Sequence, residues 1–274
     1  MVLLVGTAGI PSSTRINSSV AGIERIKELG LGCMEVQFVR GVHMREPMAL
    51  EVRRAAIKCG VALTAHGPYY INLNAQTKAN LEKSKKWVLD SCRIGNVAGV
   101  KSVAFHPGSY HQQDPLKVYN NIRDALKDVV KVLKDENIKT TPSPEVGGKA
   151  AAFGNLKELV NLASDVEGVG FCIDFAHLHA RTNGKYNTKA EFDGVFEHVE
   201  KVLGKQALKD LHMHLSGIEY TEKGEKHHLF LKESDLNYID LIQSFKDFKI
   251  GGVITCESPD PQKDALFIQE LLKD

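Results

Sequence analysis

Short runs of apolar and β-branched residues alternate along the chain with longer segments in which apolar residues recur every three or four positions. The first pattern predicts buried strands and the second predicts amphipathic helices. Strands are expected at Val2–Gly6, Cys33–Val39, Val61–His66, Ser102–His106, Ile138–Glu145, Gly170–Asp174, Asp210–Leu215 and Gly252–Glu257. Helices are expected at Ser18–Leu29, Ala49–Lys58, Ala75–Val97, Pro115–Asp135, Leu156–Ser164, Lys189–Leu203, Leu236–Lys246 and Pro261–Leu272.

This regular alternation predicts an α/β protein with a single (β/α)8 TIM barrel over residues 1–274. The fifth strand is the least regular, because Pro142 and Pro144 cannot donate hydrogen bonds to a neighbouring strand. Two long loops, Gly41–Met48 and Gly217–Asp235, follow the second and seventh strands. In a barrel both would lie on the catalytic face.

Side chains that can bind a metal stand at the ends of six predicted strands. They are His66, His106, Glu145, Asp174, His214 and Glu257. In a closed parallel barrel these groups would meet at one end. Imidazoles and carboxylates are preferred zinc ligands. A single histidine at a strand end is usually structural, but six such groups at successive ends predict a site for more than one ion.

We expect these side chains to form three groups. The first ion would be held by His66, His106 and Glu145, and the second by Asp174, His214 and Glu257 with Glu145 as a bridge. The third would be held by His177, Glu225 and His227, since alternate residues of an extended segment point the same way. His212 shares a strand face with His214 and is the second choice there, and His228 is expected to point away from the site.

Composition limits the other possibilities. A hydrophobic content of 43% and a charged content of 25% are typical of a soluble globular protein. The net charge of +1 predicts no general attraction to nucleic acid, although a local basic patch could still contact phosphate. The five cysteines are scattered, which indicates reduced thiols in a cytoplasmic protein. No apolar run approaches the roughly 20 residues needed to span a membrane.

Several segments resemble, in order, the signatures of the endonuclease IV family of abasic-site nucleases. They are HGPYYINL, FHPGSY, CIDFAH, MHL and TCESP, and they extend from about His66 to Pro259. The resemblance implies a barrel that binds three zinc ions, flips a damaged nucleotide out of DNA and cleaves 5′ to the lesion. It implies the nine ligands named above, DNA containing abasic sites as the partner, and zinc in two or three sites, with manganese also compatible.

Further residues are expected to act on the substrate. Glu145 and Glu257 are the predicted catalytic carboxylates. Tyr69 follows His66 in a loop where its ring or hydroxyl could meet a substrate, and Ser109 lies beside backbone amides that suit a phosphate. Arg40 precedes the long loop after the second strand and is the third predicted substrate contact.

Two other functions remain open. A sugar isomerase or epimerase resembling xylose isomerase would need one divalent ion, for which Glu145, Asp174, His214 and Glu257 suffice. Such an enzyme has no need for both His66 and His106, whereas a dinuclear phosphodiesterase does. The other alternative is a barrel that binds nucleic acid without cleaving it.

Overall fold

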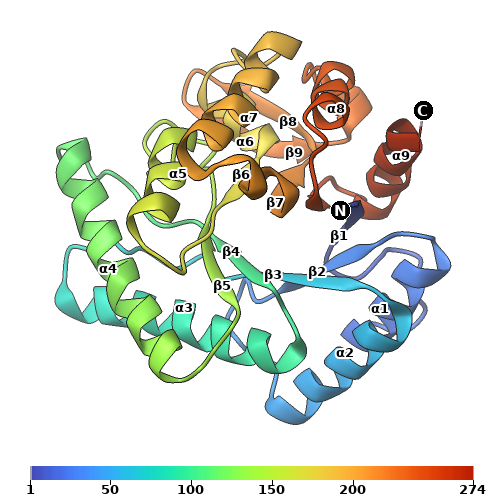
Figure 1. Cartoon of the computed structure of the whole chain (residues 1–274), viewed down its shortest axis with the longest axis horizontal. Helices are drawn as coiled ribbons and strands as arrows, with labels where there is room; N and C mark the ends of the chain where they lie inside the picture. Colours follow the sequence, from blue (N-terminus) through green and yellow to red (C-terminus); the bar gives the residue numbers. More distant parts are fainter. Residues whose placement is uncertain (1, 274) are drawn as a thin grey trace.

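A computed structural model describes residues 2–273 and contains a parallel barrel surrounded by helices (Figure 1). The barrel strands are β1 (Leu3–Ala8), β2 (Cys33–Gln37), β3 (Ala62–His66), β4 (Ser102–Phe105), β5 (Thr141–Pro144), β6 (Cys172–Asp174), β7 (Leu211–Leu215) and β10 (Gly252–Cys256). Their order is β5-β4-β3-β2-β1-β10-β7-β6, and every pairing between them is parallel. The predicted barrel is confirmed.

The barrel closes between β5 and β6 through a single bridge, Glu145 to Cys172. The amides of Thr141 and Glu145 donate to β4, so the intervening Pro142 and Pro144 occupy the positions that would donate toward β6. Because proline has no N–H, the ladder on that side is reduced. The predicted fifth strand is therefore present, and its prolines account for the weak seam.

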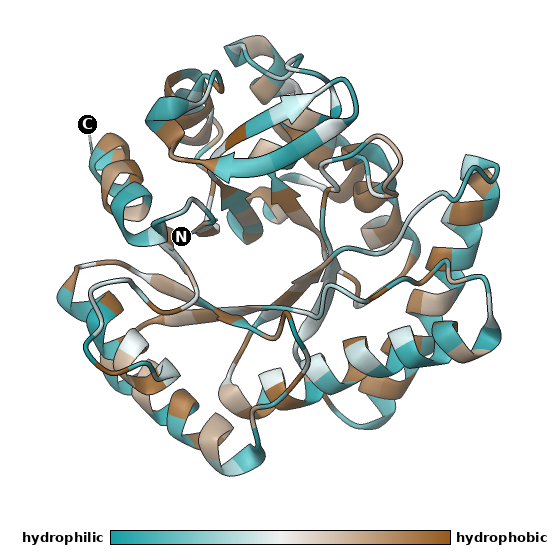
Figure 2. Cartoon of the chain, turned by 180° about the vertical axis from the view of Figure 1, so that it is seen from behind, coloured by the Kyte–Doolittle hydropathy of each residue, from teal (hydrophilic) through white to brown (hydrophobic). Residues whose placement is uncertain are grey.

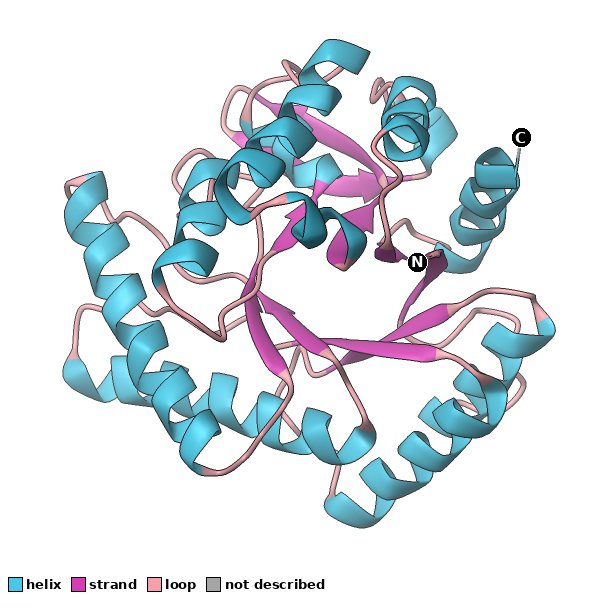
Figure 3. Cartoon of the chain, in the orientation of Figure 1, coloured by secondary structure: helices cyan, strands magenta, loops and turns pink. Residues whose placement is uncertain are grey.

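Helices lie outside the strands, as Figure 3 shows. They are α1 (Ser19–Glu28), α2 (Glu46–Cys59), α3 (Lys78–Ala98), α4 (Pro115–Asp135), α5 (Leu156–Asp165), α6 (Phe175–Arg181), α7 (Lys189–Leu203), α8 (Tyr238–Asp247) and α9 (Pro261–Lys273), with short 3-10 helices η1 (Lys205–Lys209) and η2 (Leu231–Glu233). Helix α6 was not predicted. None of the described helices has an apolar stretch long enough to cross a bilayer.

Helix α4 illustrates how local sequence sets these elements. Asp114 caps its first turn by accepting a hydrogen bond from the Lys117 amide, and Pro115 starts the helix. Val118, Ile122 and Val129 recur at helical spacing and are buried. They contribute to one large apolar cluster between the helices and the barrel, which holds the strand ends in fixed positions.

The predicted loop 217–235 instead contains a hairpin, with strands β8 (Gly217–Thr221) and β9 (Gly224–Leu229) paired antiparallel. In Figure 2 the hairpin lies in front of the barrel strands and is coloured mainly as hydrophilic or neutral. Tyr220 donates a 2.6 Å hydrogen bond to Asp235, whose other oxygen lies 3.1 Å from His179 of α6. These contacts attach the hairpin to α6.

Candidate metal centre

Glu145 lies at the centre of the converging strand ends and is fully buried. Its Oε2 lies 2.9 Å from Nε2 of His66 and 4.0 Å from Nε2 of His106. Its Oε1 lies 3.2 Å from Nδ1 of His214 and 3.3 Å from Nδ1 of His177. Each carboxylate oxygen therefore faces a different pair of imidazoles.

A second cluster shares Glu145 with the first. Nδ1 of His214 lies 3.9 Å from Asp174 Oδ2 and 3.6 Å from Glu257 Oε2. The set Glu145, Asp174, His214 and Glu257 offers ligand atoms that all lie within 4.8 Å of one another, and so does the set His66, His106 and Glu145. The structure thus brings together the six side chains expected at the strand ends.

Asp174 serves both the local fold and this cluster. Its Oδ1 accepts a 2.7 Å hydrogen bond from the backbone amide of His177 and so caps helix α6. The cap starts the helix directly at the end of β6, which places His177 on the first turn with its ring against Glu145. The other oxygen, Oδ2, is buried and accepts no hydrogen bond, and it lies 3.4 Å from Nδ1 of His177. A buried carboxylate oxygen without a hydrogen bond is costly unless a cation meets it.

The third predicted group forms only in part. Nε2 of His177 lies 3.2 Å from Glu225 Oε2, as expected. His227, however, is largely exposed, and its Nε2 lies 3.2 Å from Glu219 Oε2, away from His177. The placement predicted for His227 is wrong, and so is the outward placement predicted for His228. The His228 ring lies 5.4 Å from that of His177.

A β-bulge explains this error. Glu219 pairs with His227 and Tyr220 pairs with Glu225, so Lys226 is an extra residue in β9. An extra residue shifts the alternation of side chains by one position. Lys226 and His227 therefore both contact Glu219. Strict alternation, on which the prediction rested, fails at that point.

Close backbone packing brings the hairpin to the site. The Glu225 amide donates a 3.0 Å hydrogen bond to the Gly148 carbonyl. A Cβ on Gly148 would lie 1.8 Å from Glu225 Oε2 and 2.8 Å from Cδ2 of His177. The absence of a side chain at position 148 therefore leaves room for Glu225 and His177 to meet.

Opposite charges offset the penalty that burial imposes on this cluster. Burial opposes protonation of His66, but the surrounding carboxylates, with Glu145 the strongest, together raise the pKa of His66 to about 9. Burial likewise opposes protonation of His177, but Asp174 and Glu145 raise its pKa to about 10. Burial, together with Glu145 and Asp174, raises the pKa of Glu257 to about 8. The cluster therefore favours added positive charge.

The hydrogen bonds of His66 and His177 leave one nitrogen of each ring available to bind a metal ion. Nδ1 of His66 lies 2.8 Å from the Gly67 carbonyl, and Nδ1 of His177 lies 3.0 Å from the Val146 carbonyl. A carbonyl only accepts, so in each neutral ring Nδ1 carries the proton and the lone pair is on Nε2. Both Nε2 atoms face carboxylates, an arrangement that suits shared metal ions.

The three predicted substrate contacts lie in the loops after β2, β3 and β4, at the end of the barrel that carries the centre. Tyr69 is 62% exposed, and its ring lies 5.6 Å from that of His66, so it is available at the rim. Arg40 is exposed after β2. Ser109 lies in the loop after β4, and its carbonyl accepts a 2.9 Å hydrogen bond from the side chain of Asn74 in the loop after β3.

Sequence reasoning missed Glu35 of β2, which is fully buried inside the barrel. Its Oε2 lies 3.0 Å from Nε2 of His214 and 2.9 Å from Nε2 of His212. The sequence did contain a signal, because Glu35 is an acid between the apolar residues Met34 and Val36 in the strand CMEVQ. Glu35 lies in the middle of its strand, whereas the predicted ligands all lie at or beyond strand ends.

Comparison with known proteins places the fold in a family. A family model described as a xylose isomerase-like TIM barrel matches residues 23–273. The chain belongs to the xylose isomerase-like TIM barrel family. This xylose isomerase-like barrel is 37% identical over 270 residues to an uncharacterised protein of Methanocaldococcus jannaschii, covering 98% of this chain and 97% of that protein.

Other similarities point in two directions. An endonuclease 4 homologue of Dictyostelium discoideum is 29% identical over 170 residues, which are 59% of this chain and 30% of that relative. The crystal structure of endonuclease IV from Thermus thermophilus has a TM-score of 0.75, with 18% identity and 98% of both chains covered. A D-tagatose 3-epimerase-like protein has a TM-score of 0.73, with 18% identity, and the match covers 100% of this xylose isomerase-like barrel and 96% of that chain. These two structural likenesses support the fold alone.

Proposed function

We propose that the protein is a zinc-dependent phosphodiesterase that cleaves DNA 5′ to abasic sites. The observation that carries the proposal is the position of Glu145 between two sets of imidazoles. A carboxylate whose two oxygens face separate ligand sets suits a bridge between two ions. The motifs shared with endonuclease IV and the partial similarity to an endonuclease 4 homologue support the choice of substrate.

The residues divide into three ligand groups under this proposal. The first comprises His66, His106 and Glu145, and the second comprises Glu145, Asp174, His214 and Glu257. The third would use His177 and Glu225, with His228 in place of His227. When bound, zinc ions at such a centre would activate water and neutralise charge on the phosphate.

Glu145 and Glu257 differ in their access to solvent and substrate. Glu145 is fully buried, so its role is to hold and space the ions. The Glu257 side chain is 17% exposed and can meet solvent or substrate. As a ligand of the second ion Glu257 would be ionised, so its raised pKa of about 8 describes the metal-free cluster alone. We assign to it a catalytic role at the edge of the centre, where its carboxylate can help position the water and the reacting phosphate.

The rim residues suit an extruded lesion. Tyr69 presents an exposed ring close to His66, where it could stack on a nucleotide. Arg40 can contact a backbone phosphate and partly offset the low overall charge of +1. Ser109 completes the set in the loop after β4.

A duplex with one tetrahydrofuran residue, an abasic-site analogue, tests the proposal. Incubation with the zinc-loaded protein should produce a strand break 5′ to the analogue, and a chelator should stop it. An intact duplex of the same sequence is the control. An uncut tetrahydrofuran duplex at high protein and zinc concentrations would refute the nuclease assignment.

A single-metal sugar epimerase is the second candidate. The four residues Glu145, Asp174, His214 and Glu257 form a complete set for one ion, and a D-tagatose 3-epimerase-like protein has a similar fold. Metal stoichiometry separates the candidates, since one manganese or magnesium per chain favours the epimerase and two or three zinc ions favour the nuclease. Epimerisation of a ketohexose, followed by NMR, would support the former directly. The third candidate, a barrel that binds abasic DNA without cutting it, predicts retention of that DNA with no strand break.

A further inference from the structure

We propose that Glu35 is a positioning residue that orients His214 for metal binding from inside the barrel. The inference rests on the metal centre proposed above but not on the choice of substrate. Glu35 lies on β2, and His214 lies on β7, so the contact crosses the barrel interior. No residue of the three ligand groups supplies this support.

The hydrogen bonds of Glu35 determine which ring nitrogens of His212 and His214 carry a proton. A carboxylate only accepts, so Nε2 of His214 and Nε2 of His212 both donate to Oε2, at 3.0 and 2.9 Å. Thr64 donates to the same oxygen at 3.3 Å, and Gln37 donates to Oε1 at 3.1 Å. Four donors thus satisfy a carboxylate that is fully buried.

The chain of bonds continues on the far side of His212. Because Nε2 of His212 carries a proton, Nδ1 of the neutral ring is an acceptor, and the Ser102 hydroxyl donates a 2.9 Å hydrogen bond to it. Ser143 can then donate to Ser102 across 2.8 Å. Both nitrogens of His212 are thereby occupied by protein partners.

This network determines which nitrogen of His214 is available. With Nε2–H directed at Glu35, the lone pair of the neutral ring is on Nδ1. Nδ1 is the atom that faces Glu145 at 3.2 Å and Glu257 at 3.6 Å. Glu35 therefore turns the lone pair toward the proposed ion, as carboxylate partners of metal-binding histidines do.

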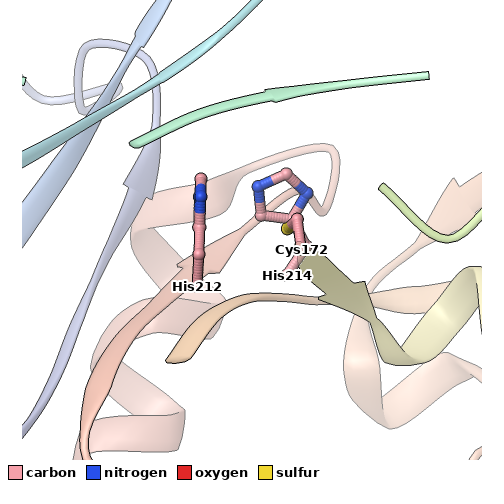
Figure 4. Close-up of side chains that lie close together, drawn as sticks. All are labelled: Cys172, His212 and His214. Carbon is pink, nitrogen blue, oxygen red and sulfur yellow. The ribbon is translucent and has the colours of Figure 1, made fainter. Parts of the chain in front are cut away.

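The same network argues against a separate metal site at Cys172, His212 and His214, whose ligand atoms also lie within 4.8 Å of one another. Figure 4 shows the rings of His212 and His214 side by side, with the Cys172 sulfur behind His214. Both nitrogens of His212 and Nε2 of His214 are already bonded to protein atoms. Cys172, His212 and His214 therefore do not form a second metal site, and His212 instead helps to hold Glu35 in place inside the barrel.

Titration of the metal-free protein with Co²⁺ and Zn²⁺ tests this role. Glu35→Gln keeps the side-chain shape but removes the charge, and Glu35→Leu also removes the acceptors. We expect Glu35→Gln to lower the affinity of one bound ion about 10- to 100-fold and to change its Co²⁺ absorption spectrum. The affinity of the ion at His66 and His106 should change far less. Ser143→Ala, at the far end of the chain of bonds, is the matched control and should keep the wild-type affinities.

The outcomes separate this inference from the proposed activity. If folded Glu35→Gln protein binds every ion as tightly as the wild type, with the same Co²⁺ spectrum, Glu35 does not position His214. Wild-type protein that binds no ion would overturn both the metal centre and this inference. If the wild type binds ions without cleaving abasic DNA, the nuclease proposal fails, while the affinity of Glu35→Gln still decides the role of Glu35.

Discussion

His227 and His228 are neighbours in the sequence but face opposite sides of the β8–β9 hairpin. His227 contacts Glu219, whereas His228 lies against His177 and shares a 2.8 Å hydrogen bond with Ser216. The bulge at Lys226 decides which of the two faces the site, because it places His228 and not His227 on the side of the hairpin that Glu225 shares with His177. The bulge in β9 therefore determines which histidine of the hairpin can bind a metal ion.

The two histidines should respond differently to substitution. His228→Ala should remove one ion or weaken its binding at least tenfold, because it deletes an imidazole beside His177. His227→Ala should leave metal content unchanged, since its side chain is largely exposed. Elemental analysis after dialysis against limiting zinc measures both. The reverse result, with loss only in His227→Ala, would show that the hairpin binds metal in another register.

Substitution of Glu145 should affect two ions together. Glu145→Ala removes the carboxylate that faces both ligand sets, so metal content should fall by more than one ion and cleavage should fall below detection. His106→Ala should also abolish cleavage but should release only one ion, because His106 approaches only Oε2 of Glu145. Metal stoichiometry and cleavage of the tetrahydrofuran duplex are the measurements. Wild-type cleavage by either variant would contradict a dinuclear centre.

A side chain at Gly148 should disturb the third ligand group. In Gly148→Ala the new Cβ would collide with the side chains of Glu225 and His177, so these two proposed ligands must shift. We expect a loss of about 1–3 kcal/mol in the free energy of unfolding and weaker binding of the third ion. Gly194→Ala is the matched control, because a Cβ there meets nothing within 4 Å on helix α7. Urea unfolding and zinc titration compare the two, and equal zinc affinities would argue against the close approach.

The stability of the metal-free protein should fall as the pH rises above neutral. A histidine whose folded pKa is raised adds stability that is complete below its unfolded pKa of about 6.5 and disappears as the pH passes the folded value. The pKa of His66 is raised to about 9 and that of His177 to about 10, so the loss should extend from about pH 6.5 to 10. The raised pKa of Glu257, about 8, acts in the same direction from about pH 4.5 upward.

Zinc should remove most of this pH dependence, because bound cations replace the protons that the cluster otherwise needs. Free zinc at about 100-fold above its dissociation constant should also add about 2.7 kcal/mol per site. Thermal unfolding at several pH values, with chelator and with zinc, measures both effects. A chelated protein whose unfolding temperature stays constant from pH 6.5 to 10 would disagree with the raised histidine pKa values.

The sequence by itself was enough to predict the barrel and the six side chains at its strand ends. Strand and helix periodicities repeat eight times, and parallel strands of one closed sheet place their carboxyl ends together. For that reason His66 and Glu257, almost 200 positions apart, could be expected in one site before their contacts were known. The irregularity of β5 could also be predicted, because a proline has no N–H and cannot donate a hydrogen bond to a neighbouring strand in any sheet.

Tertiary structure decided the rest. Whether His227 or His228 faces the site depends on a bulge whose position is set by how β8 and β9 pair. The role of Glu35 depends on contacts across the barrel with β7, far away in sequence. Periodicity reports which side of an element is buried, but it does not report which buried polar groups meet. That is settled only when distant strands are brought within hydrogen-bonding distance.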